Sequence, residues 1–286
     1  MSDVDGRLPN FLYIGPDKAG SSWLHEILLQ HPQVFLTEAK DLYFFDRYYD
    51  RGIDWYRTQF RRATAQHKVV GEVCQDYLFH PEAAKRIRND LGAVRLMVTL
   101  REPAARAYSS YLYMLKHGED VGTFREALKR RPELLDHGRY GSAIRLFLEQ
   151  FPREALHVAL FDTLQEDPQT FLDEVTSWLG INPSVLNEEQ LGARLPAGEA
   201  RSRTLARLVR HVADWTRRHD GAGLVGRVKR SLHVQRILYR PLGGVAPAIA
   251  AEDADLVWDL LGDEMDLVSD LTGVDVRGAW TFATRP

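Results

Sequence analysis

A lysine inside a glycine-bounded loop is the residue of this chain best suited to chemistry. Gly15 and Gly20 enclose Lys18, and Ser21 and Ser22 follow directly. The apolar residues before Gly15 predict a short buried strand, and the pattern after Gly20 predicts an amphipathic helix that begins near Ser21. The N–H groups of such a loop and the positive end of the helix dipole both point at one anion. The segment therefore predicts a phosphate-binding loop.

The place of the lysine separates this loop from that of nucleoside triphosphatases. The spacing from Gly15 to Gly20 fits the pattern GxxxxGK[ST], but serines occupy the last two places. Lys18 lies within the loop instead, which favours an anionic nucleotide other than a Mg-bound triphosphate. The alternative is a strand-to-helix turn that needs its glycines for geometry alone.

A second candidate anion site follows another apolar run, 94–100. Arg101 comes next, Pro103 suits the first turn of a helix, and Arg106 and Ser109 lie on that helix. A guanidinium group binds phosphate oxygens in pairs. In a parallel sheet both loops would lie at the carboxyl edge of the strands, where ligands bind. A solvated arginine at a strand end is the alternative.

Together the two segments resemble the sulfotransferases that use 3′-phosphoadenosine 5′-phosphosulfate (PAPS), in their heparan-sulfate-type and bacterial branch. PDKAGSSWL is similar to the 5′-phosphosulfate loop of that family, and REPAARAYS is similar to its 3′-phosphate motif. The resemblance implies that Lys18 contacts the sulfonate-bridging oxygen and that Arg101 and Ser109 bind the 3′-phosphate. The full set of donor-binding residues that it implies is Lys18, Ala19, Gly20, Ser21, Ser22, Trp23, Arg101, Ser109 and, in a looser match, Arg203.

The resemblance also implies where the catalytic base lies. The family has a lysine-glutamate-x-histidine-Phe-Phe-Asp motif, and this chain has KDLYFFD at 40–46. Asp41 replaces the glutamate and Tyr43 replaces the histidine. We expect Asp41 to be the base, with Glu38 as a rival because the aspartate side chain is one methylene shorter. For either carboxylate a surface acid without a catalytic role is the alternative.

Glu72 is the third candidate catalytic residue. The segment GEVCQDY at 71–77 resembles the family's G-E-x-x-P-x-Y, with Tyr77 matching and the proline absent. Glu72 would orient Lys18 or line the acceptor site. A carboxylate that simply ends a strand is the other interpretation. The family resemblance extends over about 10–182.

Composition and periodicity predict one α/β domain with a mainly parallel central sheet, flanked by helices and carrying a P-loop-like phosphate-binding loop. The 286 residues include 44% hydrophobic and 27% charged residues, as in ordinary soluble domains. Within 1–286 we expect a nucleotide-binding core at 10–182 and a mostly helical part at 183–286 that covers the site. Strands are expected at 10–14, 69–73, 94–100 and 155–161, and helices at 21–30, 52–61, 80–90, 103–117, 123–130, 139–150, 168–179, 203–218 and 253–271.

The remaining features narrow the function class. The single cysteine, Cys74, fits a reducing compartment. The N-terminus is unlike a signal peptide, and no apolar run is long enough to span a membrane. We therefore expect a cytoplasmic protein. The His and Cys residues do not have the spacing of a metal site, so no metal is expected. The net charge is −3, yet 201–240 holds eleven Lys or Arg and two Asp. With few aromatic residues there, this basic stretch favours cofactor cover over nucleic-acid contact. A solvated helix face is the alternative.

The expected activity is PAPS-dependent sulfonate transfer to a hydroxyl of a small-molecule or carbohydrate acceptor, with 3′,5′-diphosphoadenosine (PAP) as the product. The alternatives are a P-loop-type kinase of a small molecule and a nonenzymatic module that binds nucleotide or nucleic acid. The acceptor and the oligomeric state do not follow from the sequence.

Overall fold

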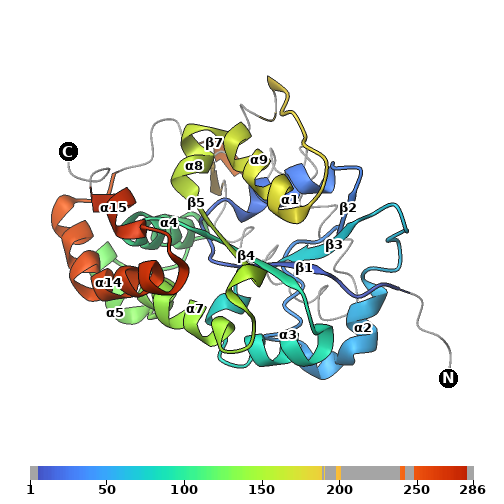
Figure 1. The fold of residues 1–286 in the computed structure, drawn as a ribbon. Coiled ribbons are helices and arrows are strands. Elements are labelled where there is room, and N and C mark those ends of the chain that lie inside the picture. The colour runs from blue at the N-terminus through green and yellow to red at the C-terminus, as the bar shows by residue number, and fades with distance from the viewer. Residues whose placement is uncertain (1–5, 189, 191–197, 201–238, 242–247, 282–286) are drawn as a thin grey trace.

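The central sheet places strands side by side that lie far apart in the sequence. The computed structural model describes residues 6–188, 190, 198–200, 239–241 and 248–281. Within these residues, five parallel strands form one sheet in the order β2-β3-β1-β4-β5 (Figure 1). The strands are β1 (Phe11–Gly15), β2 (Val34–Leu36), β3 (Val69–Val73), β4 (Arg95–Leu100) and β5 (Leu156–Leu160). A separate antiparallel pair joins β6 (Gly198–Ala200) to β7 (Tyr239–Pro241).

Helices connect the strands and cover the sheet. They are α1 (Ser21–Leu29), α2 (Gly52–Thr58), α3 (Ala83–Leu91), α4 (Pro103–Lys116), α5 (Phe124–Arg130), α6 (Glu133–Asp136), α7 (Tyr140–Leu148), α8 (Phe161–Glu166), α9 (Pro168–Leu179), α14 (Ala251–Thr272) and α15 (Val276–Thr281). Short 3₁₀ turns lie at Tyr49–Arg51, Tyr77–Phe79 and Arg153–Ala155. Among the described residues, no helix combines the length and the apolar character that crossing a membrane requires.

Strand β1 shows why both faces of the sheet are covered. Phe11 and Tyr13 belong to a buried cluster with α1 and α9, while Leu12 and Ile14 belong to a second cluster with α3 and α7. Side chains alternate between the two faces of a strand, so a run that is apolar at every position needs helices on both sides. Figure 1 shows α1, α8 and α9 on one side of the sheet and α2, α3 and α7 on the other.

The C-terminal helix α14 attaches to this core through α4 and α7. Val257 and Leu261 of α14 pack with Ala104 of α4 in a third buried cluster, and Met265 joins the cluster around α7. The start of α4 is capped by Glu102, whose carboxylate accepts from the backbone N–H groups of Ala104 and Ala105. This capping satisfies N–H groups that a helix start otherwise leaves open.

The expected class, an α/β fold with a mainly parallel sheet flanked by helices, is confirmed. The expected strand at 155–161 is one residue too long at each end, because β5 begins at Leu156 and α8 begins at Phe161. The helices α6, α8 and α15 and the three-residue β2 are additions to the expected elements. The helix expected at 203–218 lies outside the described residues. The division into a core at 10–182 and a covering part at 183–286 stays a prediction.

Gly71 should be required for the close pairing of β1 and β3. A Cβ atom at Gly71 would lie 2.6 Å from the backbone oxygen of Phe11, its partner in the neighbouring strand. Gly71→Ala should therefore force backbone movement and lower the free energy of unfolding by about 1–3 kcal/mol. The control is Gly262→Ala within α14, where the added Cβ finds its nearest atom 3.8 Å away; it should raise that free energy by about 0.5–1 kcal/mol. Urea unfolding of the two variants measures both effects, and equal stabilities would contradict this packing.

Candidate functional site

The two predicted anion-binding segments meet at the carboxyl edge of the sheet. β1 and β4 are parallel neighbours, so the residues that follow them leave the sheet at the same edge. Arg101, directly after β4, donates from Nη1 to the backbone oxygen of Lys18 at 2.9 Å. Its guanidinium also lies over the ring of Phe161, 4.8 Å from the ring centre. The expected juxtaposition of the two segments is therefore present in the structure.

The loop after β1 has the backbone of an anion-binding turn. Lys18 and Gly20 both have positive φ angles, 63° and 86°, a region that glycine enters without strain. Gly20 is the N-cap of α1 and offers no side chain to cap the helix. The first N–H groups of α1 thus keep their capacity for an outside acceptor. At α4, in contrast, the carboxylate of Glu102 already fills that role.

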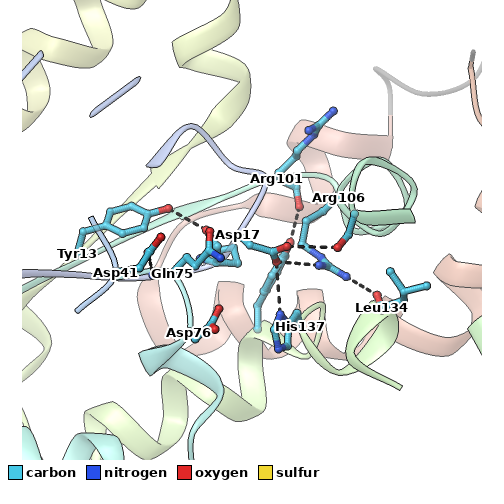
Figure 2. A network of polar contacts seen from close by, with 12 residues as sticks. Tyr13, Asp17, Asp41, Gln75, Asp76, Arg101, Arg106, Leu134 and His137 are labelled. Carbon is cyan, nitrogen blue, oxygen red and sulfur yellow. Dashed lines mark hydrogen bonds and ion pairs between the residues drawn. The ribbon is translucent and has the colours of Figure 1, made fainter. Parts of the chain in front are cut away.

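A buried carboxylate, Asp17, holds this loop in place. Arg106 on α4 donates from Nη1 to Asp17 Oδ1 at 3.0 Å, and Ser110 donates to Oδ2 at 3.3 Å. His137 Nδ1 lies 3.4 Å from Oδ1 (Figure 2). Burial would raise the pKa of Asp17, but the charge of Arg106 and the hydrogen bond with His137 outweigh it and hold that pKa below its ordinary value.

Further contacts fix the surroundings of Asp17. Arg106 also donates to the backbone oxygen of Leu134, as Figure 2 shows. Tyr140 donates from its hydroxyl to the backbone oxygen of Arg101 at 2.9 Å, and Tyr13 donates to that of Pro16 at 3.1 Å. The loop is therefore tied to β1, to α4 and to the segments that lead into α7.

Lys18 points its ammonium group at an aromatic ring. Its Nζ lies 3.4 Å from the centre of the Tyr113 ring on α4, a cation–π contact. Burial lowers the pKa of Lys18 to about 8; Asp17 opposes this shift, and the positive charge of Lys40 adds to it. The lysine is thus positioned near the loop anion site, and its ammonium group loses its proton at a lower pH than an exposed lysine does.

The segment that holds Asp41 lies beside the phosphate-binding loop. Lys40 donates to Ser21 Oγ at 2.8 Å, and its Nζ is 3.6 Å from Asp41 Oδ1. The backbone N–H of Gln75 donates to the same Asp41 oxygen at 3.2 Å. Asp41 itself is buried and has a φ of 63°. The rival Glu38 is instead ion-paired with the exposed Arg62.

Glu72 lies in the interior of β3 and supports the segment that holds Asp41. Its Oε1 accepts from the backbone N–H of Leu42 at 2.9 Å, and its Oε2 accepts from the Tyr56 hydroxyl at 2.8 Å. The Tyr77 hydroxyl lies 3.0 Å from both oxygens and accepts from the N–H of Phe44 at 2.9 Å. With these partners rather than Lys18, Glu72 has the contacts of a positioning residue. A catalytic role for it stays a prediction.

The other expected donor-binding residues have varied surroundings. Ala19 is buried, Ser22 is half-buried, and the buried Trp23 ring packs edge-on against Phe171 of α9. Ser109 is half-buried on α4, whereas its neighbour Ser110 is the serine that contacts Asp17. Arg203 lies outside the described residues.

Asp17, Tyr113 and His137 belong to this site but do not stand out in the sequence. One signal for Asp17 exists: an acidic residue inside an anion-binding loop is unfavourable unless a buried cation neutralises it. Tyr113 and His137 come from distant segments, and no sequence pattern connects them to the loop. Within the described residues, no group of three or more His, Cys, Asp or Glu side chains is arranged to hold a metal ion.

Comparison with known proteins gives consistent matches. A family model described as "Sulfotransferase domain" matches residues 8–195. The human bifunctional heparan sulfate N-deacetylase/N-sulfotransferase 3 is 31% identical over 213 residues, which cover 65% of this chain and 24% of that protein. The human heparan sulfate glucosamine 3-O-sulfotransferase 3A1 is 32% identical over 190 residues, or 63% of this chain and 46% of that protein. The chain thus matches less than half of the length of either relative.

A solved structure agrees with the fold. The crystal structure of a sulfotransferase from Alicyclobacillus acidocaldarius superposes with a TM-score of 0.70 at 19% identity. The match covers 96% of this chain and 99% of that one. At this identity the likeness establishes the architecture of the chain.

The buried Glu72 should make stability depend on pH. Burial raises the pKa of Glu72 from 4.5 to about 8, so the folded chain keeps a proton that the unfolded chain releases. Stability should therefore fall between about pH 4.5 and pH 8, by at most about 1.4 kcal/mol per pH unit. Glu72→Gln should remove this component of the slope, and Glu174→Gln at an exposed position on α9 should leave it unchanged. Urea unfolding at a series of pH values measures the slopes; identical slopes for Glu72→Gln and the unaltered chain would exclude the assignment.

Proposed function

Because the chain belongs to the sulfotransferase domain family, we propose that it transfers a sulfonate group from PAPS to a hydroxyl group of a carbohydrate or small-molecule acceptor. The observation that carries the proposal is the 2.9 Å hydrogen bond between Arg101 and the backbone oxygen of Lys18. It joins two anion-binding segments at one sheet edge, as a nucleotide with phosphate groups at both its 3′ and 5′ positions requires.

The residues at this edge fit such a donor. Ser21 and the N-terminus of α1 would hold the 5′-phosphate, and Lys18 would stand beside the sulfonate-bridging oxygen. Arg101 would bind the 3′-phosphate with Ser109. The N–H groups at the start of α4 already bond to Glu102. The 3′-phosphate would therefore be bound by side chains and not by these N–H groups. A bound PAPS supplies an activated sulfonate whose sulfur accepts a nucleophile.

The chain's own residues then divide the chemistry of the transfer. Asp41 accepts the proton of the acceptor hydroxyl while the oxygen of that hydroxyl forms a bond to the sulfur of PAPS. Lys18 stabilises the electron pair that stays on the 5′-phosphate oxygen as the old S–O bond breaks. Glu72 keeps the backbone around Leu42 in place, and hence positions Asp41. The products are the sulfated acceptor and PAP, with the acceptor's proton on Asp41.

The names of the relatives support a carbohydrate acceptor. Two of them act, by name, on heparan sulfate, one of these on its glucosamine. The chain covers 24% and 46% of those proteins. For this chain we therefore propose an acceptor from the class of sugars and small alcohols or phenols.

A transfer assay separates the proposed activity from that of a small-molecule kinase. With radiolabelled PAPS and a panel of sugar and phenol acceptors, the chain should form labelled product in the presence of a metal chelator. Labelled ATP with Mg²⁺ should give no phosphorylated product. Transfer from ATP, or nucleic-acid binding with a steep salt dependence and no sulfonate transfer to any acceptor, would contradict the proposal.

Lys18→Ala should reduce turnover at saturating PAPS by about 10²- to 10³-fold, the effect of removing one preorganised electrostatic donor. The control is Lys85→Ala, which removes an exposed lysine on α3, on the other side of the sheet from α1 (Figure 1), and should change turnover little. Since the pKa of Lys18 is about 8, PAP affinity of the unaltered chain should fall as pH rises above 8. That fall should be missing in Lys18→Ala. Near-normal turnover in this variant would reject the role of Lys18.

Asp41→Asn keeps the shape of the side chain and removes its basicity. It should lower kcat by about 10²- to 10⁴-fold while PAP affinity, measured by calorimetry, stays the same. Glu38→Gln is the matched control and should retain activity, because Glu38 pairs with Arg62. A large loss in Glu38→Gln together with normal activity in Asp41→Asn would transfer the role of base to Glu38.

A further inference from the structure

Glu102 places a buried carboxylate directly after Arg101, the arginine expected to bind the 3′-phosphate. Its Oε1 accepts from the backbone N–H of Ala104 at 3.0 Å, and its Oε2 accepts from that of Ala105. The carboxylate thus occupies the N-terminus of α4, a place where an anion is stabilised. At α1 the N-cap Gly20 offers no such side chain. The two helix starts at this sheet edge therefore differ: one is open to an outside anion, and the protein closes the other with its own.

Carboxylates of the protein compensate part of the charge of Arg101. Burial lowers the pKa of Arg101, whereas Tyr140, Glu102 and Asp162 oppose that shift. Asp162 is held in place by Trp280 of α15, whose indole N–H donates to Oδ2 at 2.9 Å. A 3′-phosphate therefore has to bind Arg101 in the presence of negative charges that are fixed in the fold.

Hydrogen bonds support the charged form of Glu102. Burial raises the pKa of Glu102, but its hydrogen bonds with the N–H groups of Ala105 and Ala104 and the charge of Arg101 oppose that rise. Both kinds of contact favour an ionised carboxylate. Like charges repel each other more strongly in buried surroundings than in water, so Glu102 should oppose an anion that binds to Arg101.

We propose that Glu102 is a specificity-determining residue whose negative charge weakens the binding of the 3′-phosphate. The proposal rests on the proposed function, in which Arg101 binds this phosphate. Because PAPS and PAP both carry the 3′-phosphate, Glu102 acts on both, and after transfer it shortens the time for which PAP stays bound. Arg101 thus selects a nucleotide with a 3′-phosphate, and Glu102 keeps the product from binding too tightly.

Two variants of Glu102 that differ from each other only in charge test this role. Aspartate and asparagine are equally good N-caps, and Asp167 already forms the same kind of cap before a proline at the start of α9. Glu102→Asn should bind PAP about three- to tenfold more tightly than Glu102→Asp does, the effect of removing one partly screened like charge. It should also release PAP more slowly by a similar factor. Both variants should bind 5′-AMP equally, because this nucleotide lacks the 3′-phosphate.

Further variants separate the charge of Glu102 from its capping role. Asp167→Asn removes an exposed carboxylate from the matching cap of α9 and should leave the affinities for both nucleotides unchanged. Glu102→Gln is a second neutral variant and should share the tighter PAP binding of Glu102→Asn. Calorimetry measures the affinities, and stopped-flow displacement measures the release of PAP.

The possible results distinguish this proposal from the proposed function. Equal PAP affinities of Glu102→Asn and Glu102→Asp, in a chain that prefers PAP over 5′-AMP, would overturn the role of Glu102 and leave the proposed function standing. Weaker binding of both nucleotides by the neutral variants would show that Glu102 only supports the start of α4, and would also overturn its role. An unaltered chain that binds neither nucleotide would contradict the proposed function, and the role of Glu102 with it.

Discussion

The buried ion pair between Asp17 and Arg106 is the interaction on which the site depends. Arg106 is fully buried and Asp17 nearly so, and removing one partner of such a pair typically costs about 3–5 kcal/mol because the other charge is left without compensation. The pair joins the loop after β1 to α4, the helix that follows β4. The distance between the two anion-binding segments is therefore fixed by this buried contact between them.

The charges around this pair differ in how fully an opposite charge compensates them. Asp17 neutralises Arg106 inside the protein, and Asp41 and Gln75 share the ammonium group of Lys40. Lys18 has a ring rather than a carboxylate at its ammonium group. Interior charges that compensate each other stabilise the loop, while the cations nearest to the start of α1 have weaker compensation. An anionic donor would complete the balance, which explains how several basic groups can gather around one short loop.

The sequence allowed prediction where the physical signal is local or follows from topology. The apolar runs of β1, β3, β4 and β5 are long enough to indicate strands, and parallel pairing then places Lys18 and Arg101 at one edge. Strand β2 has three residues, Val34–Leu36, too few to show a period. The contacts of Asp17 with Arg106 and His137 span 89 and 120 positions, so they arise from tertiary packing. The resemblance matched Arg106 to a family motif, and the structure shows that its partner is the loop aspartate. The apolar neighbours of Glu72 indicate a buried strand. They do not indicate its hydrogen bonds with Leu42, Tyr56 and Tyr77.

The central claim is that this sheet edge binds one nucleotide through phosphates at two separate positions. The most direct measurement compares PAP with 5′-AMP, which lacks the 3′-phosphate, by calorimetry on the unaltered chain and on Arg101→Ala. We expect the unaltered chain to prefer PAP by about tenfold to hundredfold, as one charge-assisted contact implies, and Arg101→Ala to weaken PAP far more than 5′-AMP. Equal affinities of the unaltered chain for PAP and 5′-AMP would contradict this claim.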